Sequence, residues 1–342
     1  MRPKDLGMLV LLGAIWGGSF LFIRVAVPVL GPFALMELRV GLAAVTLALY
    51  AVAVARLPKL RARWKEFLTL GALNGAIPFS LIGTAELNLT ASLAAILNST
   101  TVLFAAVVAA VWMGEALTTK KVIGVVSGIA GVAVLVGWTP IALNGVVLLS
   151  VGATLVASLS YALAGTYAKR TFVGASPLAL AIGQLTGAAT LLFPLAAVSL
   201  PGKVPSSAVT FSVLALALLC TAIAYLLYFR LITNVGPTKT LTVTYLVPAF
   251  GLVFGVLFLG EPVGVGTFVG LGIIFSSVAL VTEIRPKWPE RGSSTQITDG
   301  SAVEFVEAHE DLPKGGWQRV LALWGSAATP FFKSGTGHRA KR

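Results

Sequence analysis

Polar residues recur at helical spacing inside long apolar stretches of this sequence, and their chemistry suits the binding of a small polar molecule. Asn98 precedes Thr101 by three residues, and Thr154, Ser158 and Tyr161 follow the spacing i, i+4, i+7. On a helix, residues at these spacings share one face. Comparable sets are Thr221, Tyr225 and Tyr228, Thr240 with Thr244, Trp16 with Ser19, and Asn74 with Phe79. Hydroxyl, amide and aromatic groups could bind a zwitterion, although such Ser, Thr and Asn residues also join helices by hydrogen bonds of about 0.6 kcal/mol each.

Arg39 is the basic residue that lies deepest in an apolar stretch, about 10 Å from the start of that stretch at Pro32. A charge near the centre of a membrane costs about 2.5 to 3.5 kcal/mol on insertion scales, so it needs a partner or a wet cavity. Arg39 is therefore a candidate to bind a substrate carboxylate. The alternative is a structural arginine that snorkels or pairs with a glutamate such as Glu37.

Glu86 lies at the end of another apolar stretch and is a candidate site for a coupling proton or cation, with plain solvation at the interface as the alternative. Pro78 and Pro248 interrupt helical hydrogen bonding and are candidate hinges, although a static kink is an equally common outcome. Glu115 and Glu261 each follow a glycine at a break between apolar stretches, where capping or bracing is expected.

The composition indicates a membrane protein with several spanning helices. Hydrophobic residues make up 57% of the 342 residues and charged residues 11%, with a mean hydropathy of +0.92. A soluble globule of this size could not cover its surface with polar groups. The net charge of +12 comes largely from short breaks between apolar stretches, so it sets orientation and does not indicate nucleic-acid binding. Cys220 is the only cysteine and both histidines lie near the C-terminus, so we expect no metal site and no cofactor.

The apolar stretches are long enough to cross a membrane, which takes roughly 20 residues. Ten spans are predicted: residues 6–27, 32–55, 67–87, 91–113, 118–138, 144–168, 176–199, 207–229, 237–259 and 263–283. Placing the N-terminus in the cytoplasm leaves only Arg24 and Lys203 in the outer loops. The inner side then holds Arg2, Lys4, Arg56, Lys59, Arg61, Arg63, Lys65, Lys120, Lys121, Lys169, Arg170, Arg230 and Lys239. Since Lys and Arg accumulate on the cytoplasmic side, this asymmetry predicts that both termini are cytoplasmic.

The sequence contains an internal duplication. Residues 91–136 return 146 positions later as residues 237–282, with identities at Phe104 and Phe250, Gly114 and Gly260, Glu115 and Glu261, and Gly124 and Gly270. At a shift of 145, Pro32 meets Pro177 and Ala43 meets Ala188. Because each unit holds five spans, an odd number, the second unit must be inverted in the membrane. The predicted organisation is residues 1–140 and 141–283 as inverted repeats, followed by a disordered cytoplasmic tail over residues 284–342.

These features resemble the drug/metabolite transporter superfamily, and more specifically its ten-helix EamA-type exporters. The likeness is carried by Trp16-Gly17-Gly18-Ser19, Leu38-Arg39, the segment Ala91-Ser92-Leu93-Ala94-Ala95, and the stretch from Pro248 to Gly260-Glu261. The resemblance implies alternating access through a central pocket between the repeats, and export of amino acids or related metabolites across a bacterial inner membrane. Two positions depart from the pattern: Val102 stands where the second repeat has Pro248, and Glu86 replaces a usual leucine.

The prediction is therefore a secondary exporter, with no enzymatic activity, that moves amino acids, with aromatic and other neutral ones as candidates and protons as the candidate coupling ion. The candidate substrate residues are Trp16, Arg39, Asn74, Phe79, Asn98, Thr101, Ser158, Tyr161, Tyr225, Tyr228 and Thr244. One alternative is a multidrug or cationic-compound exporter, which would favour a deep carboxylate that the first span lacks. Another is a membrane-embedded scaffold or enzyme, and an enzyme would need a His, Asp or Cys constellation at one depth.

Overall fold

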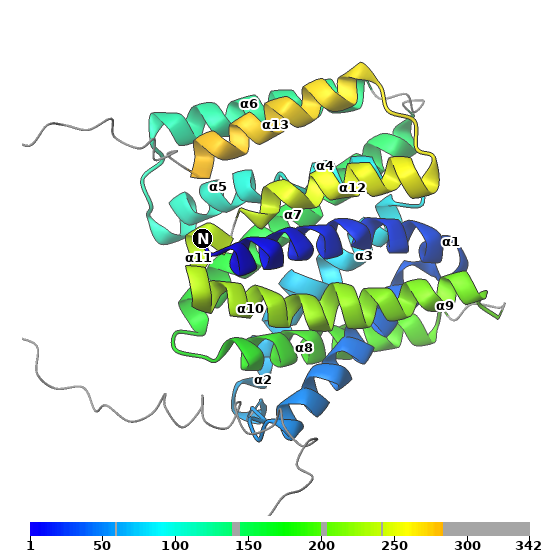
Figure 1. Cartoon of the computed structure of the whole chain (residues 1–342), viewed down its shortest axis with the longest axis vertical. Coiled ribbons are helices and arrows are strands. Elements are labelled where there is room, and N and C mark those ends of the chain that lie inside the picture. The colour runs from blue at the N-terminus through cyan, green and yellow to red at the C-terminus, as the bar shows by residue number, and fades with distance from the viewer. Residues whose placement is uncertain (59, 139–143, 200–203, 241, 283–342) are drawn as a thin grey trace, which may run out of the picture. The chain divides into compact units, whose positions relative to one another are not determined.

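The structure, a computed structural model, describes residues 1–58, 60–138, 144–199, 204–240 and 242–282. Every regular element in these residues is helical, and none is a strand (Figure 1). The predicted disordered tail, residues 284–342, lies outside the described residues.

The elements follow the predicted apolar stretches closely. In chain order they are α1 (Pro3–Ala53), η1 (Arg61–Arg63), α2 (Trp64–Gly71), η2 (Ala72–Ala76), α3 (Ile77–Ala85), α4 (Ala91–Asn98), α5 (Thr101–Met113), α6 (Thr119–Gly137), α7 (Gly145–Thr171), α8 (Pro177–Ala197), α9 (Ser207–Leu214), η3 (Ala215–Ile223), α10 (Ala224–Val235), α11 (Pro237–Thr240), α12 (Val243–Leu259) and α13 (Val265–Thr282). Here η1 is a 3₁₀ helix, and η2 and η3 are π-helical segments that continue α2 into α3 and α9 into α10.

Eight helices among the described residues are long and apolar enough to cross a membrane, where the sequence predicted ten spans. Two differences account for this. The first two predicted spans form one element, α1, which bends at Gly31 (φ 71°, ψ 162°), a conformation that suits a residue without a Cβ. The ninth is split, and its longer part, α12, has 17 residues.

The outer surface of the helices is apolar. Large side chains such as Val111, Leu149, Phe193 and Leu257 are well exposed, each on a different helix. A soluble protein would bury such residues, whereas in a membrane they face lipid tails. With the length of the helices, this surface identifies a multi-pass membrane protein.

Both π-helical segments lie at corresponding places in the duplicated sequence. Residues 72–76 of η2, shifted by 146, fall on residues 218–222, which lie within η3. Pro78 explains part of the first segment, because its nitrogen carries no hydrogen for the carbonyl of Leu73 five residues earlier. The hydroxyl of Ser160 on α7 donates to this carbonyl instead, at 2.7 Å.

The helices α6 and α13 pack closely against each other, and glycines on both helices allow this approach. A Cβ placed on Gly270 would lie 2.9 Å from the Cα of Leu135, and one on Gly124 would lie 2.8 Å from the carbonyl oxygen of Ser277. Neither helix contributes a residue to the lining of the cavity described below, and both lie at one edge of the bundle (Figure 1). These glycines therefore serve packing.

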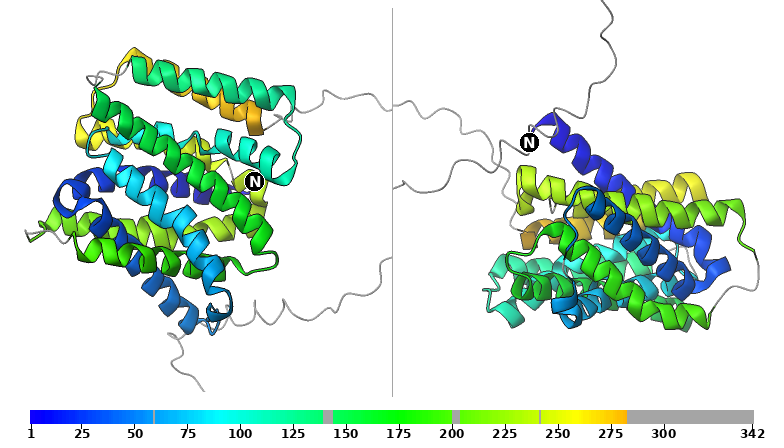
Figure 2. Two further views of the ribbon diagram at one scale, coloured as in Figure 1. Left: turned by 180° about the vertical axis from the view of Figure 1, so that it is seen from behind. Right: turned by 90° about the horizontal axis from the view of Figure 1, so that it is seen from below.

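Around the centre, helices from the two halves of the chain alternate. The helix α1 packs against α8 and α12, while α7 packs on α3 and α5, as the view from behind shows (Figure 2). The helices α4 and α12 also pack together. Side chains from residues far apart in the sequence consequently meet at the centre of the bundle.

Candidate functional site

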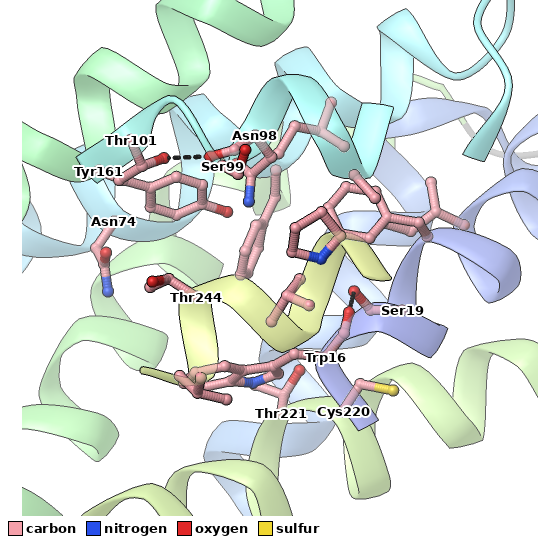
Figure 3. A pocket seen from close by; sticks show the side chains of 18 of the residues that line it. Trp16, Ser19, Asn74, Asn98, Ser99, Thr101, Tyr161, Cys220, Thr221 and Thr244 are labelled. Carbon is pink, nitrogen blue, oxygen red and sulfur yellow. Dashed lines mark hydrogen bonds between the residues drawn. The ribbon is translucent and has the colours of Figure 1, made fainter. Parts of the chain in front are cut away.

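A cavity of about 310 Å³ lies between these central helices. Its size is at the lower end of the range for ligand pockets, roughly 300 to 1,000 Å³, so it suits a small metabolite. Of the fourteen residues proposed from the sequence as substrate, coupling or hinge residues, eleven line it: Trp16, Arg39, Asn74, Phe79, Asn98, Thr101, Tyr161, Tyr225, Tyr228, Thr244 and Pro248. Figure 3 shows Tyr161, Asn98 and Thr101 on one side of the cavity, and Trp16, Thr221 and Cys220 on the opposite side.

Arg39 is the only charged residue among those that line the cavity, and it is 6% exposed. Its Nε donates to the hydroxyl of Thr221 on η3 at 3.1 Å, and its guanidinium carbon lies 4.0 Å from the centroid of the Phe79 ring. No carboxylate in the described part of the chain forms an ion pair with it, and this includes Glu37. Neutral groups thus hold the guanidinium in place, and it remains able to bind an anionic group of a ligand.

A second polar group is built from side chains of three different elements. Asn74 on η2 donates from its Nδ2 to the Oε1 of Gln184 on α8 at 2.7 Å. The same nitrogen lies 3.5 Å from the hydroxyl of Tyr225 on α10, which also interacts with Gln184. The carboxamide oxygen of Asn74 has no hydrogen-bond partner among the described residues, so it can accept a hydrogen bond from a ligand.

Aromatic rings form much of the remaining wall. Trp16 on α1 and Tyr228 on α10 have ring centroids 5.4 Å apart, and Phe79 on α3 meets Tyr161 on α7 edge to face at 6.3 Å. Such pairs orient one another, and they offer flat apolar faces with few rotatable bonds. The cavity therefore combines one cation, several neutral hydrogen-bonding groups and an aromatic lining.

Two of the helices that line the cavity are interrupted where they reach it. The helix α4 ends at Asn98 and α5 begins at Thr101, with Ser99 and Thr100 between them. The Thr101 hydroxyl donates to the Asn98 carbonyl at 2.7 Å (Figure 3). On the other side, α11 ends at Thr240 and α12 begins at Val243. Interrupted helices at mid-membrane depth are tolerated where they line a cavity, and they bring backbone polar groups to it.

Three of the sequence-predicted residues do not line the cavity. Ser158 is fully buried, and its hydroxyl lies 3.5 Å from the carbonyl oxygens of Leu97 and Asn98, so it supports the end of α4 from behind. Pro78 lies at the start of α3, directly after the π-helical segment η2. Glu86 lies beyond the end of α3, outside the set of lining residues.

The carboxyl group of Glu86 is completely buried, and neither of its oxygens has a hydrogen-bond partner in the described residues. The nearby Arg24 donates to the backbone carbonyl of Glu86 rather than to its side chain. The sequence placed this carboxyl in a solvated interface, and the structure contradicts that alternative. A buried carboxyl without partners is costly when ionised.

Glu261 and Glu115, which the duplication relates, have different partners. Glu261 accepts hydrogen bonds from the backbone N–H groups of Ala91 and Ser92 at 2.6 and 2.9 Å, and also from the Ser92 hydroxyl. It therefore caps the start of α4 and not the helix that follows it. Glu115 instead forms an exposed ion pair with Lys169 at 3.3 Å.

Sequence patterns missed several residues at the site. Ile82, Val243 and Val247 line the cavity but are apolar, so nothing distinguishes them from packing residues. Cys220 also lines it, and its thiol donates to the carbonyl of Ile15 at 3.1 Å. Gln184 was missed although it is polar within an apolar run. Its place in the duplication, 145 residues after Arg39, was the available signal.

Comparison with known proteins agrees with this architecture. The sequence model of the EamA-like transporter family matches residues 5–137 and 148–283. An uncharacterized transporter of Bacillus subtilis, YvbV, is 29% identical over 80% of this chain and 90% of its own. An uncharacterized inner membrane transporter of Escherichia coli, YedA, is 27% identical over 81% of this chain and 90% of its own.

More distant relatives extend the likeness. An uncharacterized transporter of Archaeoglobus fulgidus is 21% identical over 81% of this chain and 98% of its own. A protein of known crystal structure shares the fold, with a TM-score of 0.60 and 18% identity over 83% of this chain and 98% of that one. The family match covers well over half of the chain, in the same helices that surround the cavity. This chain belongs to the EamA-like transporter family of the drug/metabolite transporter superfamily.

Proposed function

We propose that this protein exports amino acids, including aromatic and other neutral ones, or related small carboxylate-bearing metabolites. The observation that carries this proposal is the buried guanidinium of Arg39, which lines the cavity without a carboxylate partner in the described residues. A substrate carboxylate would supply the missing anion. The aromatic pairs around Trp16 and Phe79 would cover an apolar or aromatic side chain.

We propose further that the transport cycle uses two inverted repeats, residues 1–140 and 141–283, each with five membrane crossings. The two arms of α1, together with α12, would bring the number of crossings to ten. The double match of the family and the corresponding π-helical segments support the repeat. So does a pair of related hydrogen bonds: Asn88 donates to Ser150 at 3.3 Å, and Asn234, 146 residues after Asn88, donates to Asp5 at 2.9 Å.

In this proposal the binding site is reached alternately from each side of the membrane. With both termini in the cytoplasm, Glu261 and the start of α4 lie on the outer side, and Glu115 lies on the inner side. The hydrogen bonds from Ala91 and Ser92 to Glu261 would hold the outer side closed. The exposed pair of Glu115 with Lys169 is compatible with an inner side that is not held in this way. Pro248 in α12 and Pro78 beside η2 are the candidate hinges.

Glu86 is the proposed coupling site, with a proton as its ligand. Its buried carboxyl has no partner in the described residues, so the neutral, protonated form is favoured while the outer side is closed. Opening that side to water would allow the proton to leave. Proton movement would then be linked to the conformational change.

The alternatives are less well supported. An exporter of cationic drugs would place its substrate beside the Arg39 charge, which repels it. A scaffold would not need a cavity lined by polar and aromatic groups. An enzyme is disfavoured because the named relatives are called transporters. YedA is named an inner membrane protein, and we propose a bacterial inner membrane for this chain also.

The experiment is transport of labelled L-phenylalanine and phenethylamine in proteoliposomes, with wild-type protein and Arg39→Ala. Phenethylamine matches phenylalanine except that it lacks the carboxylate. The proposal expects wild-type transport of phenylalanine and a loss of about tenfold or more in Arg39→Ala, because a charged hydrogen bond contributes about 1.5 to 3 kcal/mol. Equal losses for both compounds would remove Arg39 from the site, and no transport of any amino acid or metabolite by folded protein would favour a scaffold.

A further inference from the structure

Two polar residues that correspond in the duplicated sequence contribute to the cavity: Arg39 lines it, and Gln184 does not line it but holds Asn74, which does. Gln184 follows Arg39 by 145 residues, the same shift that relates Pro32 to Pro177 and Ala43 to Ala188. Arg39 lies on the second arm of α1 and Gln184 lies on α8, and these two helices pack against each other. Both side chains are 6% exposed.

Their partners lie on corresponding segments. Arg39 donates to Thr221 on the π-helical segment η3, and Gln184 accepts from Asn74 on the π-helical segment η2. Each half of the chain thus places one long side chain against the π-helical segment of the other half. We call the first contact, Arg39 with Thr221, the cationic pole, and the second, Gln184 with Asn74 and Tyr225, the amide pole.

The two poles differ in charge. At the cationic pole, Arg39 offers N–H donors and a full positive charge. At the amide pole, the Gln184 oxygen is occupied by the Asn74 amide, and the open position is the Asn74 carboxamide oxygen, which is an acceptor. An anionic group placed there would face an acceptor and no cation, and it would lose its hydration without compensation.

We infer that Gln184 determines specificity together with Arg39, so that the site takes substrates with one carboxylate and a neutral or cationic hydrogen-bond donor at the other end, and rejects dicarboxylates. This inference rests on the proposed function and refines its substrate class. Gln184 acts by holding the Asn74 carboxamide in place. The nitrogen of that carboxamide then points to Gln184, and its oxygen is left for the substrate. L-Glutamine meets both requirements through its α-carboxylate and its side-chain amide, whereas L-glutamate bound through its α-carboxylate brings a second carboxylate to the amide pole.

The test compares transport of L-glutamine and L-glutamate, which differ only in an amide and a carboxylate, in proteoliposomes of the full chain. The variants are Gln184→Arg, Arg39→Gln and the double variant that exchanges the two residues. We expect wild type to prefer glutamine, Gln184→Arg to shift that preference toward glutamate by about tenfold or more, and Arg39→Gln to lose transport of both by a similar factor. The exchange should recover much of the transport that Arg39→Gln loses, because it moves the cation to the corresponding position.

Gln184→Glu provides a variant that keeps the size of the side chain and the hydrogen bond from Asn74. It should lower glutamate transport more than glutamine transport, so the preference for glutamine should increase. Arg170→Gln is the matched control, since Arg170 contacts the carbonyl of Trp112 outside the cavity. In this variant the ratio of glutamate to glutamine transport should stay at the wild-type value. This inference alone is overturned if wild type transports glutamine but the ratio of glutamate to glutamine transport is the same in wild type, Gln184→Arg and Gln184→Glu. A wild type that moves no amino acid overturns the proposed function as well.

Discussion

The carboxylate of Glu261 accepts hydrogen bonds from both the backbone N–H and the hydroxyl of Ser92 at the first turn of α4. The two residues are 169 positions apart and belong to different halves of the chain. A carboxylate at a helix N-terminus interacts with unpaired N–H groups and with the helix dipole. The contact therefore joins the end of α12 to the start of α4 firmly.

Removing this contact should open the proposed outer side of the protein. We expect Glu261→Ala to raise the rate at which an impermeant thiol reagent, added from outside, modifies a cysteine in the cavity. The reporter is Thr101→Cys in a Cys220→Ala background, which leaves one cysteine. Loss of a charged hydrogen bond contributes about 1.5 to 3 kcal/mol, so the rate should rise about tenfold or more.

Glu115→Ala is the matched control for that experiment. Glu115 corresponds to Glu261 in the duplication, but its partner is the exposed Lys169, and exposed ion pairs contribute about 0 to 1 kcal/mol. The labelling rate from outside should stay near the wild-type value. If Glu261→Ala and Glu115→Ala raised the rate equally, the proposed closing role of Glu261 would be wrong.

Glu86→Gln should separate transport from the proton gradient. The amide has the size of the acid but cannot release a proton, so substrate movement down its own gradient should persist while a pH gradient no longer drives accumulation. The measurement is uptake into vesicles with and without an imposed pH difference. Glu66→Gln serves as the control, because the Glu66 carboxylate is partly exposed, pairs with Arg63 and does not line the cavity. Accumulation that still follows the pH difference in Glu86→Gln would exclude Glu86 as the coupling site.

The hydrogen bond from Ser160 to the Leu73 carbonyl should be needed only because Pro78 cannot make it. Ser160→Ala leaves that carbonyl without its donor, and hydrogen bonds between helices in membranes contribute about 0.6 kcal/mol on average and up to about 1.7. We expect a loss of stability in this range, and a smaller loss in the Pro78→Ala background, where the backbone regains an N–H group. The test is a double-mutant cycle, in which the free energy of unfolding is measured for wild type, Ser160→Ala, Pro78→Ala and the double variant. Additive losses would contradict the explanation.

Gly270→Ala should weaken the contact between α6 and α13. The added Cβ would lie 2.7 Å from the Cβ and 2.9 Å from the Cα of Leu135, so the helices must move apart, at a cost of about 1 to 3 kcal/mol. Gly272→Ala on the same helix is the control, because its Cβ would meet no atom within 4 Å. Thermal unfolding should show a lower midpoint for the first variant only. Equal midpoints for the two variants would mean that α6 and α13 tolerate a wider spacing.

The sequence predicted the membrane class and the bounds of most helices because the length of an apolar run is set directly by the thickness of the membrane. It also placed a boundary between the predicted spans 6–27 and 32–55, and Gly31, where α1 bends, lies within that gap. It did not predict the conformation of Gly31, because a positive φ has no signature beyond the glycine itself. The π-helical segments have no signature in the apolar pattern either. A π-helical turn holds about one residue more than an α-helical turn, and this requires no change in the apolar composition.

The candidate site was predicted in part. Helical spacing was the signal for Asn98, Thr101 and Tyr161, and the structure places all three at the cavity. It was also the signal for Ser158, which contacts the end of α4 instead, because a face that points to a neighbouring helix carries the same pattern as a face that points to a cavity. Only the packing of α7 on α4 distinguishes the two cases.

The bend at Gly31 has a consequence for how the walls of the cavity move. Trp16 lies before it and Arg39 after it, both on α1, and helical hydrogen bonding flanks the glycine closely on both sides. No spare residues separate the two arms, so a tilt of one arm must be absorbed by rotation about the bonds of a single glycine or be passed to the other. The arms that carry Trp16 and Arg39 are therefore joined at one residue, and a substrate bound between the indole and the guanidinium would fix the angle between the arms.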